Sequence, residues 1–318
     1  VAVCCCGFAP RSLKYTNHVL QKNIIDQLKT SFNVDVYLYS FLSKNNVHES
    51  PNSNEHGIAV DNEDIDLLEN AVTQTIYQED IASEVKRIIA DNKIKLRDIA
   101  IINFIRGLLM EQKSFQMICE SSKKYDSIVY VHPDMFFAKP ISLKEVFDTI
   151  NNKNCIYTTH FNDWNGYGTG FYIGSPKAIG CVASQINNLP TNLAKIEPER
   201  LLKKTIENMK LSRYKSSMFH FKVRASGTPD VYYQLLKKYT TTKEYMGTLA
   251  QFKKVTKGLG SSDTSEHRRS SNSKDDTYIK RSRKHSRDVK SGKGGSSKLE
   301  TTSNPKSKRH HKRRSCPG

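Results

Sequence analysis

The chain has 318 residues, 37% of them hydrophobic, and a formal net charge of +18 at pH 7. Hydrophobic content this low argues against a chain that is folded from end to end. No run reaches the roughly 18 to 20 apolar residues that cross a bilayer, and the opening VAVCCCGFA lacks the basic start of a secretory signal. Seven cysteines without a CxxC pair indicate neither a zinc site nor a disulfide framework. We therefore expect a cytoplasmic protein.

The charge is concentrated at the carboxyl-terminal end. From Thr256 onward there are 18 Lys and Arg against 6 Asp and Glu, a net +12, with almost no aliphatic residues. We expect a folded domain over residues 1–254 and a disordered basic tail rich in Ser, Lys and Arg over residues 255–318. Such a tail suits binding to nucleic acid or another anionic surface, and a solvated tail without a partner is the alternative.

The first half of the chain reads as strand, helix and strand. An apolar run, residues 1–6, precedes a helical pattern with Leu20, Ile24 and Leu28 at fourfold spacing, and residues 34–41 form the next apolar run. We expect a surface loop over residues 42–63, because it is rich in Asn, Ser, His and Gly. Three helices are then predicted, over residues 65–76, 81–89 and 97–122.

The second half is organised around a central strand, Ser127–Val131, which ends on His132, Pro133 and Asp134. Open α/β sheets place their ligand chemistry at such a carboxyl end. A helix is predicted after Ser142 with Glu145 completing a capping box. Strands are expected at residues 155–159, 170–174 and 217–225, and helices from residue 176, within 186–215 and over 232–246.

Four segments together carry a family resemblance. They are VAVCCCGFAPRSL, YDSIVYVHPDMFFAKPI, GTGFYIGSPKAI and FKVRASG, in this order along the chain. The chain resembles nucleotide-sugar glycosyltransferases of the GT-A fold, of the kind found in large DNA viruses and bacteria, with His-Pro-Asp in place of the Asp-x-Asp motif. The resemblance implies an α/β, Rossmann-like nucleotide-diphospho-sugar transferase fold with a mostly parallel central sheet. It also implies transfer of a sugar from a nucleotide-sugar donor to a glycan or protein acceptor.

The resemblance also assigns roles to individual residues. It implies a Mn²⁺ or Mg²⁺ ion bound by Asp134, which we expect to be an exposed residue, and by His220. It places the donor nucleotide beside Gly7, Arg11, His132 and Gly170. Each assignment has a structural alternative: Asp134 as a cap carboxylate, the two histidines as hydrogen-bonded structural residues, and Arg11 as an ordinary surface cation.

An inverting enzyme also needs a carboxylate base for its acceptor. Asp163 is the candidate, with Asp230 behind it, and Trp164 and Tyr167 are candidates for stacking on a sugar ring.

Three hypotheses of function follow. The first is an active glycosyltransferase, and the second is a catalytically degenerate relative that binds a nucleotide or glycan without turnover. The third is a nucleic-acid-associated structural protein that acts through its basic tail. The Asn, Ile and Lys content suits an AT-rich genome such as that of a large DNA virus, for which the setting would be the host cytoplasm or the virion.

Overall fold

The computed structural model describes residues 1–50, 55–92, 99–161, 163, 165–189 and 197–257. Residues 1–260 form one compact unit. The predicted basic tail falls almost wholly outside the described residues and stays a prediction. Among the helices that the structure describes, none is long and apolar enough to span a membrane.

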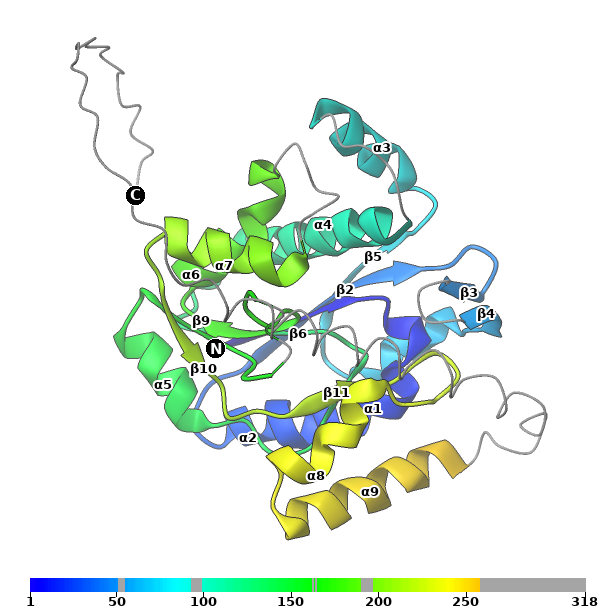
Figure 1. Ribbon diagram of the computed structural model, residues 1–318, viewed down its shortest axis with the longest axis vertical. Helices are drawn as coiled ribbons and strands as arrows, with labels where there is room; N and C mark the ends of the chain where they lie inside the picture. Colours follow the sequence, from blue (N-terminus) through cyan, green and yellow to red (C-terminus); the bar gives the residue numbers. More distant parts are fainter. Residues whose placement is uncertain (51–54, 93–98, 162, 164, 190–196, 258–318) are drawn as a thin grey trace, which may run out of the picture. The chain divides into compact units, whose positions relative to one another are not determined.

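A seven-stranded sheet with the order β10-β8-β9-β6-β1-β2-β5 forms the centre of this unit (Figure 1). Every neighbouring pair is parallel except the two pairs made by β9, which runs antiparallel to both β6 and β8. The predicted α/β fold with a mostly parallel central sheet is therefore confirmed. The strands are β1 (Ala2–Gly7), β2 (Asp35–Leu42), β5 (Val72–Tyr77), β6 (Ile128–Val131), β8 (Cys155–Thr158), β9 (Phe171–Gly174) and β10 (Ser212–Lys215).

Two hydrophobic cores cover the two faces of the sheet, because successive side chains of a strand point to opposite faces. In β1, Cys4 and Cys6 belong to one core, while Val3 and Cys5 belong to the other. The three adjacent cysteines are therefore buried strand residues, and all three thiols are free.

Helices cover both faces (Figure 1). The first core is closed by α3 (Ala82–Asp91), α4 (Ile99–Glu120), α6 (Pro176–Ala183) and α7 (Pro198–Asn208). The second core is closed by α1 (Leu13–Leu20), a π-helical turn (Gln21–Asp26), α2 (Gln27–Lys29) and α5 (Leu143–Asn151).

A separate antiparallel ribbon lies beyond the carboxyl end of β6. It pairs β7 (Met135–Phe137) with β11 (His220–Lys222). The strand predicted over residues 217–225 is thus shorter than expected, and Phe219, Phe221 and Val223 in and around it are buried in a third core. That core is closed by α8 (Leu236–Tyr239) and α9 (Thr242–Thr256), which replace the single predicted helix over residues 232–246.

Two predicted elements in the first half are wrong. The expected loop over residues 42–63 contains a hairpin of β3 (Val47–Ser50) and β4 (Glu55–Ala59). The expected helix over residues 65–76 is a 3-10 turn (Asn62–Leu67) followed by β5, which pairs with β2. The β-branched residues of β5 fit a pleated strand, and pairing with β2 favours the strand over a helix.

The predicted capping box at α5 is also wrong. Ser142 makes no side-chain cap hydrogen bond. The Glu145 carboxylate instead accepts hydrogen bonds from Ser216 Oγ at 2.6 Å and from the Ser217 backbone nitrogen at 2.7 Å. Glu145 therefore anchors the segment that leads from β10 into β11, a long-range contact that local spacing does not reveal.

Candidate functional site

The site forms where β1 and β6 end, because parallel neighbours deliver their carboxyl ends to the same edge of the sheet. Gly7 ends β1 with a φ of +146°, and a Cβ atom there would lie 2.9 Å from Pro133 Cδ. The backbone after β1 can approach the His132–Asp134 turn this closely only because residue 7 lacks a side chain. Gly7 thus brings the Arg11 loop beside Asp134.

We expect Gly7→Ala to lower the free energy of unfolding by roughly 1–3 kcal/mol, because the added methyl group meets Pro133 and the backbone conformation is strained. Urea denaturation measures this change. The control is Gly247→Ala in α9, where a Cβ meets nothing within 4 Å and helix propensity should raise stability by about 0.5–1 kcal/mol. Equal effects of the two substitutions would contradict a steric role for Gly7.

Asp134 is the central carboxylate of the site, and it is 2% exposed rather than exposed as predicted. Its Oδ2 atom contacts the Arg11 guanidinium and lies 3.9 Å from Lys222 Nζ. Burial alone would raise the pKa of Asp134, but Lys222, Arg11 and other nearby positive groups hold that pKa well below its usual range. Asp134 is therefore ionised at all physiological pH values.

The two histidines of the prediction are brought to the same site, where His220 is buried and His132 is partly buried. Burial, with the Lys222 charge as the next cause, lowers the pKa of both His132 and His220 to about 3. Both rings are therefore neutral near pH 7, the form in which imidazole binds a metal ion. Gly170 packs against His132, since its φ is +86° and a Cβ there would lie 3.0 Å from His132 Nδ1.

Two unpartnered atoms test whether these residues fit a metal ion. Asp134 Oδ1 and His220 Nδ1 are buried and make no hydrogen bond to any described residue. An oxygen and a neutral nitrogen are suitable donors for Mn²⁺. No group of three His, Cys, Asp or Glu residues within the described ranges could hold a metal by itself. The donors thus fit a cation whose remaining ligands come from a bound molecule.

Positive charge surrounds this pair of donors. Lys222 and Arg224 follow His220 at two-residue steps, at the end of β11 and just after it, and Arg11 contacts the same Asp134 oxygen that Lys222 approaches. A cluster of three cations, Arg11, Lys222 and Arg224, therefore surrounds Asp134, and such a cluster favours a multiply charged anion. The sequence analysis missed Lys222 and Arg224 as site residues, although their spacing from His220 was the available signal.

The two predicted catalytic carboxylates have different surroundings. Asp163 is bound by Arg213 Nη2 at 2.9 Å and accepts a hydrogen bond from the Gly168 backbone nitrogen, also at 2.9 Å. Asp230 lies beside the cation cluster, where burial raises its pKa against the opposing charges of Lys222 and Arg224. Trp164 lies outside the described residues. The Arg213 guanidinium packs on the Tyr167 ring, with its Cζ atom 4.7 Å from the ring centroid.

The β3–β4 hairpin closes the site on the side of Arg11. The Glu55 carboxylate accepts a hydrogen bond from the Ser226 backbone nitrogen at 3.2 Å and lies 3.4 Å from His48 Nε2. The His48 ring in turn packs on Phe8, which directly precedes the Arg11 turn. A cavity of about 480 Å³ adjoins His48 at the carboxyl ends of β2 and β5; its lining includes Ser43, Asn45, Gln78, Asn103 and Arg106.

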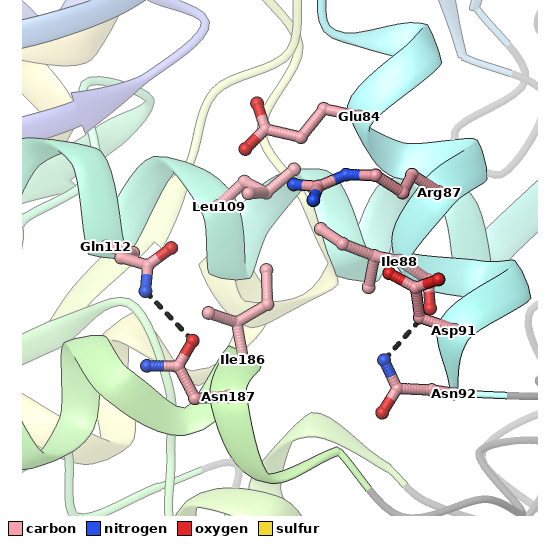
Figure 2. A pocket seen from close by; sticks show the side chains of 9 residues that line it. All are labelled: Glu84, Arg87, Ile88, Asp91, Asn92, Leu109, Gln112, Ile186 and Asn187. Atoms are coloured by element: carbon pink, nitrogen blue, oxygen red, sulfur yellow. Dashed lines mark hydrogen bonds between the residues drawn. The ribbon is translucent and has the colours of Figure 1, made fainter.

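A second hollow, of about 210 Å³, lies between α3, α4 and the turn at residues 184–188. Figure 2 shows Glu84, Arg87 and Asp91 of α3 on one side of it and the hydrogen-bonded pair Gln112 and Asn187 on the other. None of the predicted site residues lines this hollow or the cavity beside His48. We place the functional site at the strand ends because Asp134 meets Arg11, Lys222 and the two histidines there.

A buried acid beneath the sheet was also missed by the sequence analysis. Glu111 of α4 is 6% exposed, and burial raises the pKa of its carboxyl to about 8. Glu111 accepts hydrogen bonds from Gln185 Nε2 at 3.1 Å and from the Tyr172 hydroxyl at 3.4 Å. It sits in the first core with no local pattern to distinguish it from a surface glutamate of a helix.

Glu111 predicts a pH-dependent stability. Its folded pKa of about 8 exceeds the ordinary value of 4.5, so the folded protein retains a proton that the unfolded chain releases. The resulting stabilisation is present in full below pH 4.5 and is lost as the pH rises through about 8, an effect on the order of a few kcal/mol. Glu111→Gln should show a flatter dependence in urea denaturation between pH 5 and 9, and parallel curves would contradict the assignment.

No family model and no curated protein matches this chain. Among solved structures, it is similar to apo mouse xyloside xylosyltransferase 1, with 9% identity over 68% of this chain and 85% of that chain and a TM-score of 0.35. It is similar to the galactosyltransferase LgtC with donor and acceptor sugar analogues, with 10% identity over 83% and 98% of the two chains and a TM-score of 0.35. The apo bifunctional glycosyltransferase WbbM shows 12% identity over 80% of this chain and 44% of that chain, with a TM-score of 0.35. All three of these proteins are named as glycosyltransferases.

Proposed function

We propose that this chain transfers a sugar from a nucleotide-sugar donor to an acceptor. The observation that carries the proposal is the buried Asp134 with Arg11, Lys222 and Arg224 around it and two neutral histidines beside it, at the carboxyl end of parallel strands. This combination of fixed positive charge and metal-donor atoms suits a diphosphate.

The leaving group explains why such a site is useful. When the bond between the sugar and the diphosphate breaks, negative charge grows on the departing phosphate oxygen. Arg11 and Arg224 offer planar donor pairs that match phosphate oxygens, and Lys222 offers a compact charge. These cations are held in place before the donor binds, so they stabilise the developing charge without rearrangement.

A divalent cation, Mn²⁺ or Mg²⁺, fits this site as a partner of the diphosphate. Asp134 Oδ1 and His220 Nδ1 would hold it, with His132 beside them. When bound, it would supply further neutralisation of the leaving diphosphate. Because the described protein residues provide few donors, its affinity should depend on the nucleotide.

The nucleoside part of the donor fits the cavity of about 480 Å³ at the carboxyl ends of β2 and β5. Asn45, Gln78 and Asn103 offer amide groups that donate and accept hydrogen bonds, as recognition of a base edge requires. The hairpin residues His48 and Glu55 connect this cavity to the segment around Arg11 and Ser226.

Of the two candidate bases, Asp230 suits acceptor activation better than Asp163. Burial raises the pKa of Asp230, which is the direction that favours a general base, and Asp230 adjoins the cations of the proposed diphosphate site. The Asp163 carboxylate is paired with the Arg213 cation and also accepts a hydrogen bond from the Gly168 backbone nitrogen. The Asp230 carboxylate accepts a hydrogen bond from the Tyr232 backbone nitrogen at 3.0 Å. If transfer is inverting, Asp230 would accept the proton of the acceptor hydroxyl, and Asp163 would shape the loop before β9.

Calorimetry with a panel of nucleoside diphosphates and nucleotide sugars, with and without Mn²⁺, tests the proposed function. We expect at least one nucleotide to bind more tightly with Mn²⁺, and its sugar conjugate to be hydrolysed slowly to free sugar. Binding without hydrolysis or transfer to any acceptor would favour the degenerate relative, which the His132 replacement in the motif makes the second candidate. If no nucleotide binds and nucleic acid does, the function belongs to the tail.

A further inference from the structure

Glu111 belongs to a chain of buried hydrogen bonds that ends at the site. The Gly170 backbone nitrogen donates to the Tyr172 hydroxyl at 3.1 Å, and that hydroxyl donates to Glu111 Oε1 at 3.4 Å. Gln185 Nε2 donates to the other carboxyl oxygen at 3.1 Å. We call this chain of hydrogen bonds, from Gln185 through Glu111 and Tyr172 to Gly170, the relay. It runs from the first core to the loop beside His132.

Gly170, at the end of the relay next to the site, is tightly packed. A Cβ there would lie 2.7 Å from Met135 Cε and 3.0 Å from His132 Nδ1 and Cε1, so the Gly170 backbone is packed directly against the His132 ring. His132 has no room to stay in place if this backbone moves inward. The Tyr172 hydroxyl is therefore placed to set where the Gly170 backbone lies.

A carboxyl group in this core is costly unless it serves a purpose, because burying a polar group requires hydrogen-bond partners that an apolar residue does not. The groups that face Glu111 are Cys4 and Cys6 of β1, Tyr130 of β6 and Tyr172 of β9, besides Gln185. None of them is a cation. Glu111 thus has no ion-pair partner among these described neighbours, and its role is that of a neutral hydrogen-bonding group.

We propose that Glu111 and Tyr172 are positioning residues, which fix the Gly170 backbone against His132 and so preserve the binding geometry for the donor. Loss of the relay should release the Gly170 amide and weaken donor binding without removing any group that touches the donor. The second part of this inference rests on the proposed function, whereas the first does not.

The test uses the full chain and four variants. Tyr172→Phe and Glu111→Leu break the relay, and Glu111→Gln preserves an acceptor for Tyr172. The matched control is Tyr130→Phe, because Tyr130 is also buried, packs 5.3 Å from the Tyr172 ring and contacts Cys6 Sγ instead of Gly170. The first readout is exchange of the Gly170 amide, followed by nuclear magnetic resonance on protein labelled at its 16 glycines. The second is the Kd for uridine diphosphate with Mn²⁺.

We expect Tyr172→Phe and Glu111→Leu to speed exchange of the Gly170 amide and to raise the Kd about 5- to 10-fold. Glu111→Gln and Tyr130→Phe should keep both values within about twofold of the parent. Equal changes in Tyr172→Phe and Tyr130→Phe would overturn the inference, because both lose one buried hydroxyl. If the parent protein does not bind uridine diphosphate, binding of this nucleotide as part of the proposed function is wrong. Exchange of the Gly170 amide would still decide whether the relay holds Gly170.

Discussion

Asp134→Asn should abolish the Mn²⁺-dependent part of nucleotide binding and lower glycosyl transfer by at least about 100-fold. The reason is that a metal contribution to charge stabilisation is worth several kcal/mol, and 1.4 kcal/mol corresponds to a factor of ten. Without metal, the same variant should bind uridine diphosphate at least as tightly as the parent, because the cations lose their counter-charge. Calorimetry with and without Mn²⁺ measures both effects on one sample.

The same substitution should also destabilise the fold, by about 1–3 kcal/mol. Asp134 is buried, but the side chains of Arg11 and Lys222 are 19% and 37% exposed and can turn toward water once the carboxylate is gone. The control is Glu207→Gln in α7, which removes an exposed carboxylate paired with Lys203 on the surface. If Asp134→Asn retains the Mn²⁺-dependent gain of the parent, Asp134 is a structural counter-ion to Arg11.

Lys222→Met should raise the Kd for uridine diphosphate in the absence of metal by about 10- to 100-fold. A charged hydrogen-bond donor contributes about 1.5–3 kcal/mol to binding a phosphate, and methionine keeps the length of the stem without the charge. The dependence of affinity on ionic strength should also become shallower, since one fewer charge interacts with the ligand. Titration calorimetry at two salt concentrations provides both numbers.

Lys253→Met serves as the matched control, because Lys253 is an exposed lysine of α9 and lies outside the cluster. Its Kd and salt dependence should stay at the parent values. A parent-like Kd for Lys222→Met would show that Lys222 only compensates Asp134, and the diphosphate assignment would then depend on Arg11 and Arg224.

The sequence predicts the sheet well where each strand carries its own signal. The strands β1, β2 and β6 are buried on both faces, so nearly all of their residues are apolar and each strand appears in the sequence as a continuous apolar run. In contrast, β5 is an edge strand with three consecutive polar residues, Thr73, Gln74 and Thr75, and it was predicted to be a helix because only its pairing with β2 makes it a strand. The hairpin of β3 and β4 was missed for the same reason, since its apolar content is low.

The candidate site shows a similar division. His132 and Asp134 follow a recognisable strand, and their place at its carboxyl end could be predicted from sequence. The approach of Arg11 to Asp134 depends on the parallel pairing of β1 with β6. The convergence of His220 and Lys222 on Asp134 depends on the β7–β11 pairing, which brings together segments about 85 residues apart. Glu111 had no signal at all, because its burial is decided by the packing of α4 on the sheet.

The antiparallel direction of β9 has a consequence for how the site can change. Because β8 and β9 are antiparallel neighbours, the segment between them leaves and re-enters the sheet at one edge, beside the end of β6. A parallel strand in that place would require a crossover to the far edge, and its length would be constrained by the helix that makes it. A segment that only has to return to its starting edge tolerates insertions and deletions. Changes of length there would reshape the space beside His132 while the register of all seven strands stays the same, which offers a route by which related chains acquire different acceptors.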